Sequence, residues 1–184
     1  MKRIILSVIA ILFVTTSFSQ KMMTRSGEIK FESTFPGALE EIAATNKSVS
    51  SIFDKSNGDF VAQAQVKAFK FKIPLMEEHF NENYIESTTY PKADFKGKIV
   101  SFDASKLTTN KPITYDLEGN LTLHGVTNKI KTKITLTLVG TKITATSNFN
   151  ISNAAYKINI PSLVRKKVTD EVKMQLNFVL EEKK

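Results

Sequence analysis

The chain of 184 residues contains no cysteine and no tryptophan. The absence of cysteine excludes disulfide bonds, a thiol nucleophile and a lipid-modified cysteine, so the fold depends on side-chain packing alone. There are only two histidines, and the sequence has neither a Gly-x-Ser-x-Gly motif nor a glycine-rich phosphate-binding loop. Little in the sequence indicates catalysis, and we expect a protein that is not an enzyme.

Long apolar runs are absent except at the N-terminus. Lys2 and Arg3 precede a largely apolar stretch over residues 4–18, and Ser19 follows it. This pattern is typical of a secretory signal peptide cleaved after Ser19, with an uncleaved membrane anchor as the alternative. The run is shorter than the roughly 20 residues that a spanning helix needs, so no stable membrane span is expected. We therefore predict a signal peptide over residues 1–19 and a single periplasmic or secreted domain over residues 20–184.

The formal net charge is +8 at neutral pH. Basic proteins attract nucleic acid, anionic lipid and polyanionic envelope polymers. Here, however, the lysines are spread along the polar positions of alternating segments, as at Lys129, Lys131 and Lys133. This distribution favours solvated strand faces and protected strand edges, and nucleic acid is not an expected partner.

Alternation of apolar and polar residues dominates the stretch from Ile113 to Leu138. The alternation breaks at His124-Gly125 and then resumes. A period of two on both sides of a short glycine-containing break is typical of antiparallel strands with one apolar and one polar face. The same reasoning predicts strands over residues 28–35, 49–53, 60–71, 93–102, 113–124, 129–139, 142–152 and 171–181.

Three irregular features interrupt this pattern. Within residues 60–71 the apolar positions change parity, which predicts a β-bulge near Ala68. After Pro74, an apolar residue recurs every fourth position through Met76 and Tyr84, which predicts one short helix. Residues 38–44 are rich in helix-forming residues and predict one or two helical turns.

The strand count favours an all-β fold. About eight strands, nearly all adjacent in sequence, fit an up-and-down antiparallel β-barrel, with a two-sheet sandwich as the alternative. Small residues such as Ala62, Ala64, Gly97 and Gly119 share the inward parity with several phenylalanines. These residues either interdigitate into a filled core or leave an apolar cavity that is open at one end.

If the barrel is hollow, the inward parity predicts which side chains line it. The predicted lining consists of Phe31, Phe60, Ala62, Ala64, Phe71, Phe95, Leu121, Ile134, Leu136, Phe149, Met174, Leu176 and Phe178. The predicted mouth consists of Met76, His79, Phe80 and Asn83.

Several segments, taken in order, resemble the YceI-like family. They are residues 75–84 (LMEEHFNENY), 90–97 (YPKADFKG) and 117–127 (LEGNLTLHGVT), together with the closing stretch 170–180. The resemblance implies an exported, lipocalin-like, eight-stranded antiparallel β-barrel with a helix near one mouth. It also implies binding of polyisoprenoid chains, including quinones and isoprenoid phosphates.

The sequence departs from the family pattern at two places. Glu77-Glu78 stands where typical members carry an Arg-Asp pair, and residues 152–158 replace the usual Arg-x-Asp-Phe-Gly run. The chain therefore resembles a short, divergent branch of the family.

Three functional hypotheses follow. The first is an exported binding or carrier protein for an apolar, isoprenoid-like lipid, with the cations Lys70, Lys72, Arg165, Lys166 and Lys167 placed to meet an anionic head group. The second is a filled structural barrel that acts through contacts with envelope proteins. The third is a hydrolase that depends on His79. We expect a monomer or homodimer without a cofactor.

A metal site is not expected either. His79 has Glu78 and Glu82 beside it, but there is no second histidine at i+4, and metal sites gather three or four ligands with defined spacing. His124 lies beside Gly125 and is expected to be a turn residue.

Overall fold

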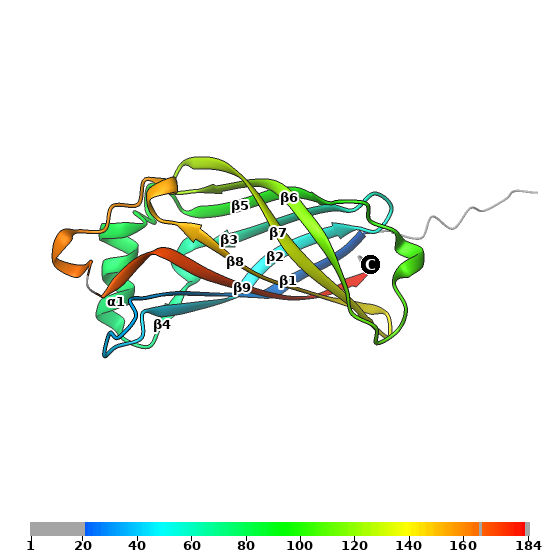
Figure 1. Cartoon of the computed structure of the whole chain (residues 1–184), viewed down its shortest axis with the longest axis horizontal. Coiled ribbons are helices and arrows are strands. Elements are labelled where there is room, and N and C mark those ends of the chain that lie inside the picture. Colours follow the sequence, from blue (N-terminus) through cyan, green and yellow to red (C-terminus); the bar gives the residue numbers. More distant parts are fainter. Residues whose placement is uncertain (1–20, 166, 183–184) are drawn as a thin grey trace, which may run out of the picture.

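One antiparallel sheet closes on itself to form the molecule (Figure 1). The computed structural model describes residues 21–165 and 167–182, so the predicted signal peptide lies outside the described residues. The strands are β1 (Lys21–Thr34), β2 (Ala43–Asp54), β3 (Asp59–Gln65), β4 (Lys70–Phe71), β5 (Lys92–Ile99), β6 (Ile113–Leu123), β7 (Val126–Val139), β8 (Lys142–Ser152) and β9 (Val168–Glu182).

The order of hydrogen-bonded neighbours is β1-β9-β8-β7-β6-β5-β3-β2, and β1 also pairs with β2. This last pairing closes the ring of strands into a barrel. The short β4 pairs with β2 beyond the end of β3, so β3 and β4 together form one interrupted strand of the barrel. The predicted eight-stranded antiparallel barrel is confirmed, and the sandwich alternative is wrong.

The predicted parity change near Ala68 is real, but its geometry differs from the prediction. A 3₁₀ turn over Val66–Ala68 separates β3 from β4, in place of a one-residue bulge. The side chain of Asn46 on β2 donates a hydrogen bond to the Gln65 carbonyl at 3.0 Å. This bond supplies a partner to the backbone where the ladder is interrupted. Because the 3₁₀ turn changes the parity, Phe60 and Phe69 are both buried inside the barrel.

The predicted helical turns over residues 38–44 are wrong. Residues 35–42 form turns and bends that connect β1 to β2, and β2 already begins at Ala43. Ala44 and Asn46 are buried in the barrel wall. Burial in the sheet therefore overrides the weak helix preference of this short segment.

The predicted short helix is confirmed at one end of the barrel. It consists of α1 (Pro74–His79), with Pro74 in the first turn, followed directly by the π-helical turn η2 (Phe80–Tyr84). Figure 1 shows α1 at the end of the barrel opposite to the end where β1 begins and the C-terminus lies. This end, which also carries the β1–β2 loop (residues 35–42) and residues 153–165, is called the mouth end below.

The opposite half of the barrel is filled. Its interior is packed with Met22, Phe53, Ile99, Tyr115, Ile134, Leu136, Ile143, Ala145, Phe178 and Leu180, all of them buried. Burying one large apolar side chain in this way stabilises the fold by about 1.5–3 kcal/mol relative to exposure. This closed end therefore anchors the barrel without a disulfide.

Two of the small residues on the inward parity interdigitate with a large one and leave no space. Gly97 and Gly119 face each other across β5 and β6. A Cβ atom at Gly97 would lie 2.5 Å from Cζ of Phe95, and a Cβ atom at Gly119 would lie 2.7 Å from the same atom. The Phe95 ring occupies the room that the paired glycines free, so the vacancy in the barrel arises elsewhere.

Candidate ligand-binding cavity

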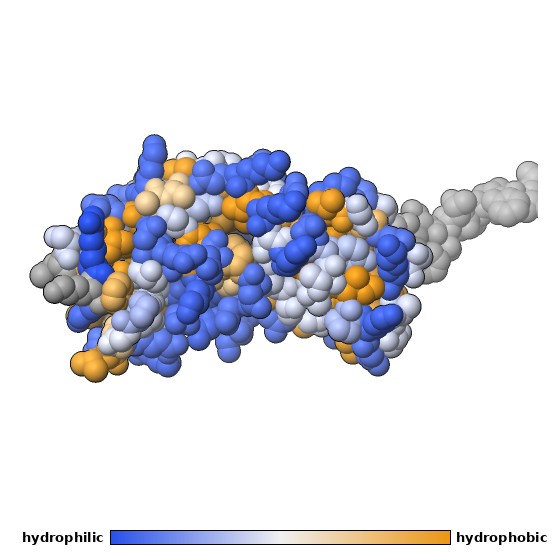
Figure 2. All heavy atoms as spheres, viewed as in Figure 1, coloured by the Kyte–Doolittle hydropathy of each residue, from blue (hydrophilic) through white to orange (hydrophobic). Residues whose placement is uncertain are grey.

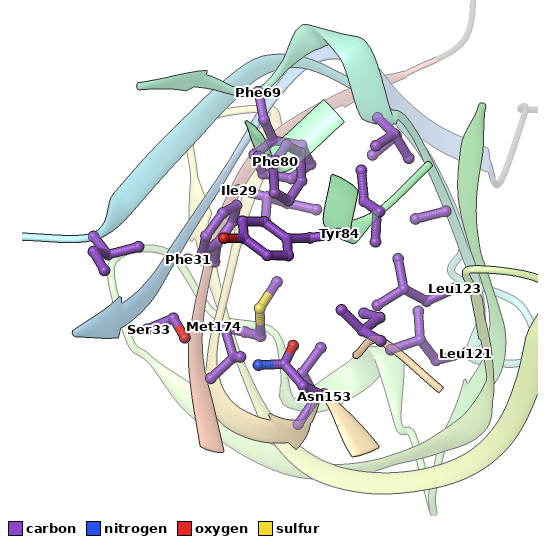
Figure 3. Close-up of a pocket in the computed structure, with 18 of the residues that line it drawn as sticks. Ile29, Phe31, Ser33, Phe69, Phe80, Tyr84, Leu121, Leu123, Asn153 and Met174 are labelled. Carbon is purple, nitrogen blue, oxygen red and sulfur yellow. The ribbon is translucent and has the colours of Figure 1, made fainter. Parts of the chain in front are cut away.

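The half of the barrel at the mouth end contains a cavity of about 510 Å³. This volume falls in the range of about 300–1,000 Å³ that is typical of small-molecule sites. Figure 3 shows side chains pointing into the cavity from around the barrel, among them Phe31, Leu121 and Met174. The wall is almost wholly apolar, and small side chains such as Ala62 and Ala64 stand where larger ones would fill the space.

The structure divides the predicted lining into two groups. The cavity wall includes Phe31, Phe60, Ala62, Ala64, Phe71, Phe95, Leu121, Phe149, Met174 and Leu176. Ile134, Leu136 and Phe178 do not face the cavity, because they lie further along β7 and β9 in the packed closed end. These three have the inward parity that was predicted, but they lie at the wrong depth.

The predicted mouth residues divide in the same way. Met76, His79 and Phe80 line the cavity. Asn83 does not line it, because the π-helical turn carries its side chain into solvent. Tyr84 lies on this turn as well, and its ring points into the cavity instead (Figure 3).

An aromatic cluster attaches α1 to the barrel wall. The Phe80 ring lies 5.4 Å from Phe31, 6.2 Å from Phe69 and 5.2 Å from Phe71, measured between ring centroids. Such pairs contribute about 0.5–1.5 kcal/mol each beyond the area that they bury. Since no residue of α1 itself is buried, Phe80 is the main apolar anchor of this helix.

A second attachment of α1 is polar. The Glu77 carboxylate accepts a hydrogen bond from Nζ of Lys70 and another from the backbone amide of Phe71 at 3.2 Å. The bond from Lys70, helped by the Phe71 amide, holds the pKa of Glu77 below its ordinary value of 4.5.

Acidification is therefore expected to loosen α1. Because the folded-state pKa of Glu77 lies below 4.5, its contribution is fully present above that pH and is lost as the pH falls through the folded-state pKa. Hydrogen exchange of residues 74–84, corrected for intrinsic rates, should rise at acidic pH. The Glu77→Gln variant should show the same fast exchange at neutral pH, whereas Glu78→Gln should behave as wild type. Equal protection of α1 in all three proteins would contradict this role of Glu77.

Polar groups inside the cavity are few and mostly have partners. The Ser147 hydroxyl donates to the Lys133 carbonyl at 2.6 Å. Near the mouth, Ser33 Oγ and Asn153 Nδ2 both donate to the Thr169 carbonyl, at 2.9 and 3.2 Å. With these groups bonded to the barrel itself, the wall offers mainly apolar contact to a ligand.

His124 joins three loops at the mouth end. Its Nδ1 donates to the Tyr156 carbonyl at 3.0 Å, and its Nε2 lies 2.8 Å from Oε2 of Glu86. The ring also packs edge-on against Tyr90, with centroids 4.5 Å apart. His124 has a positive φ of 50° and Gly125 one of 71°, which confirms the predicted turn and shows that its histidine also fixes the neighbouring loops.

Sequence reasoning missed part of the wall. Ile29, Ser33, Phe69, Leu123, Ile130 and Asn153 line the cavity but were not predicted to do so. Parity could have found Ile29 and Ser33, which share the parity of Phe31 along β1, and Leu123, which shares that of Leu121 on β6. Asn153 had no such signal, because it lies just after β8 in a turn that folds over the mouth.

A family model described as the YceI-like domain matches residues 13–180. The chain belongs to the YceI-like family. The match covers most of the chain, so the sequence resemblance and the barrel lead to the same assignment.

Solved structures share this YceI-like fold at low sequence identity. A polyisoprenoid-binding domain from Saccharophagus degradans, implicated in plant cell wall breakdown, has a TM-score of 0.77 at 16% identity, covering 89% of this chain and 99% of that one. BcnA from Burkholderia cenocepacia has a TM-score of 0.68 at 17% identity, covering 84% and 95%. The YCEI protein of Campylobacter jejuni has a TM-score of 0.65 at 15% identity, covering 80% and 88%. No curated protein matches the chain significantly.

Within residues 21–165 and 167–182, no three side chains of the His, Asp or Glu type gather closely enough to hold a metal ion. The helices in the same part of the chain are too short or too polar to span a bilayer.

Proposed function

We propose that this YceI-like domain is an exported carrier that holds an apolar, isoprenoid-like lipid inside the barrel. The observation that carries the proposal is the cavity of about 510 Å³, which is open at the mouth end and walled by apolar side chains. A chain-like ligand would cover this apolar wall, and burial of apolar surface contributes about 25 cal/mol of favourable free energy per Å². The neighbour from S. degradans, described as polyisoprenoid-binding, supports the ligand class.

The ligand itself can be sought directly. Protein purified from its own host should carry a chain-like apolar molecule, visible as a mass increment in native mass spectrometry and recoverable by solvent extraction. A polyprenol added to delipidated protein should restore the increment. If no lipid copurifies and no polyprenol binds, the carrier function is excluded.

Lys167 is proposed to meet an anionic head group. It lines the cavity, whereas Lys70 and Lys72 are held in ion pairs with Glu77 and Glu41. Arg165 lies close to Lys167 in the chain, outside the cavity wall, and Lys166 lies outside the described residues. Lys167 is therefore the cation best placed at the mouth for a phosphate.

Lys167→Ala is expected to weaken binding of an isoprenoid monophosphate by about tenfold, which corresponds to one charge-assisted contact of about 1.4 kcal/mol. Binding of the uncharged isoprenoid alcohol should not change, since the alcohol has no charge to lose. Competition against a fluorescent lipid measures both affinities, and Lys72→Ala serves as the control because Lys72 is paired with Glu41. An equal loss for phosphate and alcohol would contradict a head-group role.

Export is part of the proposal. The described fold begins with β1 at Lys21, so cleavage after Ser19 would remove no described strand. Mass determination of the protein from the envelope fraction should give an N-terminus at Gln20. An N-terminus at Met1 would contradict cleavage.

The cavity weighs against the filled structural barrel, because the mouth-end half of the interior contains a vacant space of about 510 Å³. The hydrolase hypothesis gains no support from the histidines. His79 is exposed on α1, and the bonds of His124 go to a carbonyl and a carboxylate and not to a serine or threonine hydroxyl.

A further inference from the structure

Exposed apolar side chains gather at the mouth end of the barrel. Among the described residues, four of the large apolar side chains that are exposed lie here: Phe35, Leu39, Ile73 and Leu75. Leu39 is fully exposed at the tip of the β1–β2 loop, and its neighbour Glu40 lines the cavity mouth. Figure 2 shows hydrophobic surface at the lower left, where Figure 1 places this loop. An exposed apolar cluster beside a cavity mouth is typical of an interaction surface.

Cations that form no ion pair with the described residues lie next to this loop, although Nε of Arg165 donates to the Ile160 carbonyl at 3.2 Å. The backbone amide of Phe35 donates to the Lys167 carbonyl at 2.8 Å, which fixes the loop against the segment before β9. Phe35, Lys157 and Arg165 line one shallow groove. Lys157, Arg165 and Lys167 form no ion pair within the described part of the chain, unlike Lys30, Lys70 and Lys72 at the same end. The set Phe35, Leu39, Lys157, Arg165 and Lys167 is called the tip patch below.

The carboxylates at this end lie mostly to one side. Glu77 is paired with Lys70, and Glu78 and Glu82 lie on α1 and η2. Asp170 lines the groove, but its oxygens accept bonds from Ser152 and from the Ala154 amide. Glu40 and Glu41 lie in the β1–β2 loop itself, and Glu41 is paired with Lys30 and Lys72. Beside the β1–β2 loop, the three cations Lys157, Arg165 and Lys167 therefore outnumber the two carboxylates Glu40 and Asp170.

We propose that the tip patch docks the barrel onto an anionic lipid bilayer. Phe35 and Leu39 insert at the level of the head groups, and Lys157, Arg165 and Lys167 contact the anionic phosphates. Apolar side chains flanked by unpaired cations are the combination that binds such an interface, because insertion and charge attraction act together. The acidic side of α1 tilts away from the surface. This proposal goes beyond lipid binding in the cavity and needs no cavity ligand for its test.

Because the chain contains no tryptophan, a single introduced tryptophan is a specific fluorescent reporter. Leu39→Trp places a single tryptophan in the tip patch, and Val139→Trp places one at the closed end, where Val139 is also exposed. On mixing with phosphatidylcholine vesicles that contain phosphatidylglycerol, the emission of Leu39→Trp should shift to the blue and that of Val139→Trp should not. Vesicles of phosphatidylcholine alone should give a much weaker shift. Both chain ends of the described barrel lie at the closed end (Figure 1), so a C-terminal tag leaves the patch free.

Flotation with the same vesicles tests each component. The double variant Phe35→Ser/Leu39→Ser and the double variant Lys157→Gln/Arg165→Gln should each lose about tenfold or more in vesicle affinity. Val100→Ser/Val139→Ser removes two exposed apolar residues from the closed end and should bind as wild type. Circular dichroism checks that each variant folds.

Three results would overturn the proposal. The first is wild-type protein that does not prefer anionic vesicles, and the second is tip-patch variants that float as well as wild type. The third is a solution dimer that the Phe35→Ser/Leu39→Ser variant dissociates, which would assign the patch to a second copy of the chain. A cavity that proves empty leaves these readouts unaffected, so failure of the carrier function and failure of docking are separable.

Discussion

Replacing Ala64 with phenylalanine is expected to abolish lipid loading while the barrel still folds. Ala64 is only 3% exposed, and it borders the cavity on β3. The added ring enters vacant space and takes up room that a lipid chain would need. Because the space is empty, the free energy of unfolding should change by less than about 1.5 kcal/mol, below the usual cost of overpacking a filled core.

The matched control is Lys96→Phe, which introduces the same side chain at an exposed position of the neighbouring strand β5. Native mass spectrometry measures the lipid bound per protein, and urea unfolding measures stability. Lys96→Phe should retain its lipid, and Ala64→Phe should be nearly free of it. If Ala64→Phe carries as much lipid as wild type, the ligand does not bind in the barrel.

Phe60→Ala is expected to have the largest effect on stability. Phe60 is only 1% exposed, and its ring centroid lies 6.1 Å from Phe53, 6.5 Å from Phe95 and 6.2 Å from Phe178. It forms the floor of the cavity, between the hollow half and the filled half. Truncation should lower the free energy of unfolding by about 3–5 kcal/mol. The space that it opens joins the cavity, so the variant should accept a longer chain.

Phe149→Ala provides the comparison. Phe149 also lines the cavity, but it is only partly buried because one side of its ring faces the vacant space. Its truncation should cost clearly less than that of Phe60, since fewer contacts are lost. Urea unfolding compares the two variants, and a ladder of polyprenols of increasing length tests the deeper cavity. Equal losses of stability would show that Phe60 is not packed as a floor.

Local patterns in the sequence were sufficient to predict the barrel. Alternation located the strands, and the spacing after Pro74 located α1, because both depend on residues that are close in the chain. Irregularities were harder to predict. The register of β1 against β2 shifts around Gly27, where a Cβ atom would lie 2.5 Å from Cδ1 of Phe178. A partner that distant in sequence leaves no local signal, and β1 was predicted too short for this reason.

The candidate cavity shows what parity can and cannot determine. Along β9, Met174 and Leu176 face the cavity, whereas Phe178 is packed in the closed end. Along β7, Ile130 faces the cavity and Ile134 does not. All of these residues have the inward parity, so alternation predicts the face of the sheet correctly. Depth along the barrel depends on the tilt and register of all strands together, and one sequence does not reveal it.

The Phe60 floor has a consequence for which molecules the barrel could retain. A tube with one opening admits a linear molecule tail first, and the same molecule must leave by the route it took. The distance from Phe60 to the rim then sets the length of chain that fits inside the barrel. A chain that matches it brings its polar end level with Lys167, and a longer chain leaves that end protruding into water. Such a barrel would select chains by length at its floor, separately from any contact that Lys167 makes with the polar end at the rim.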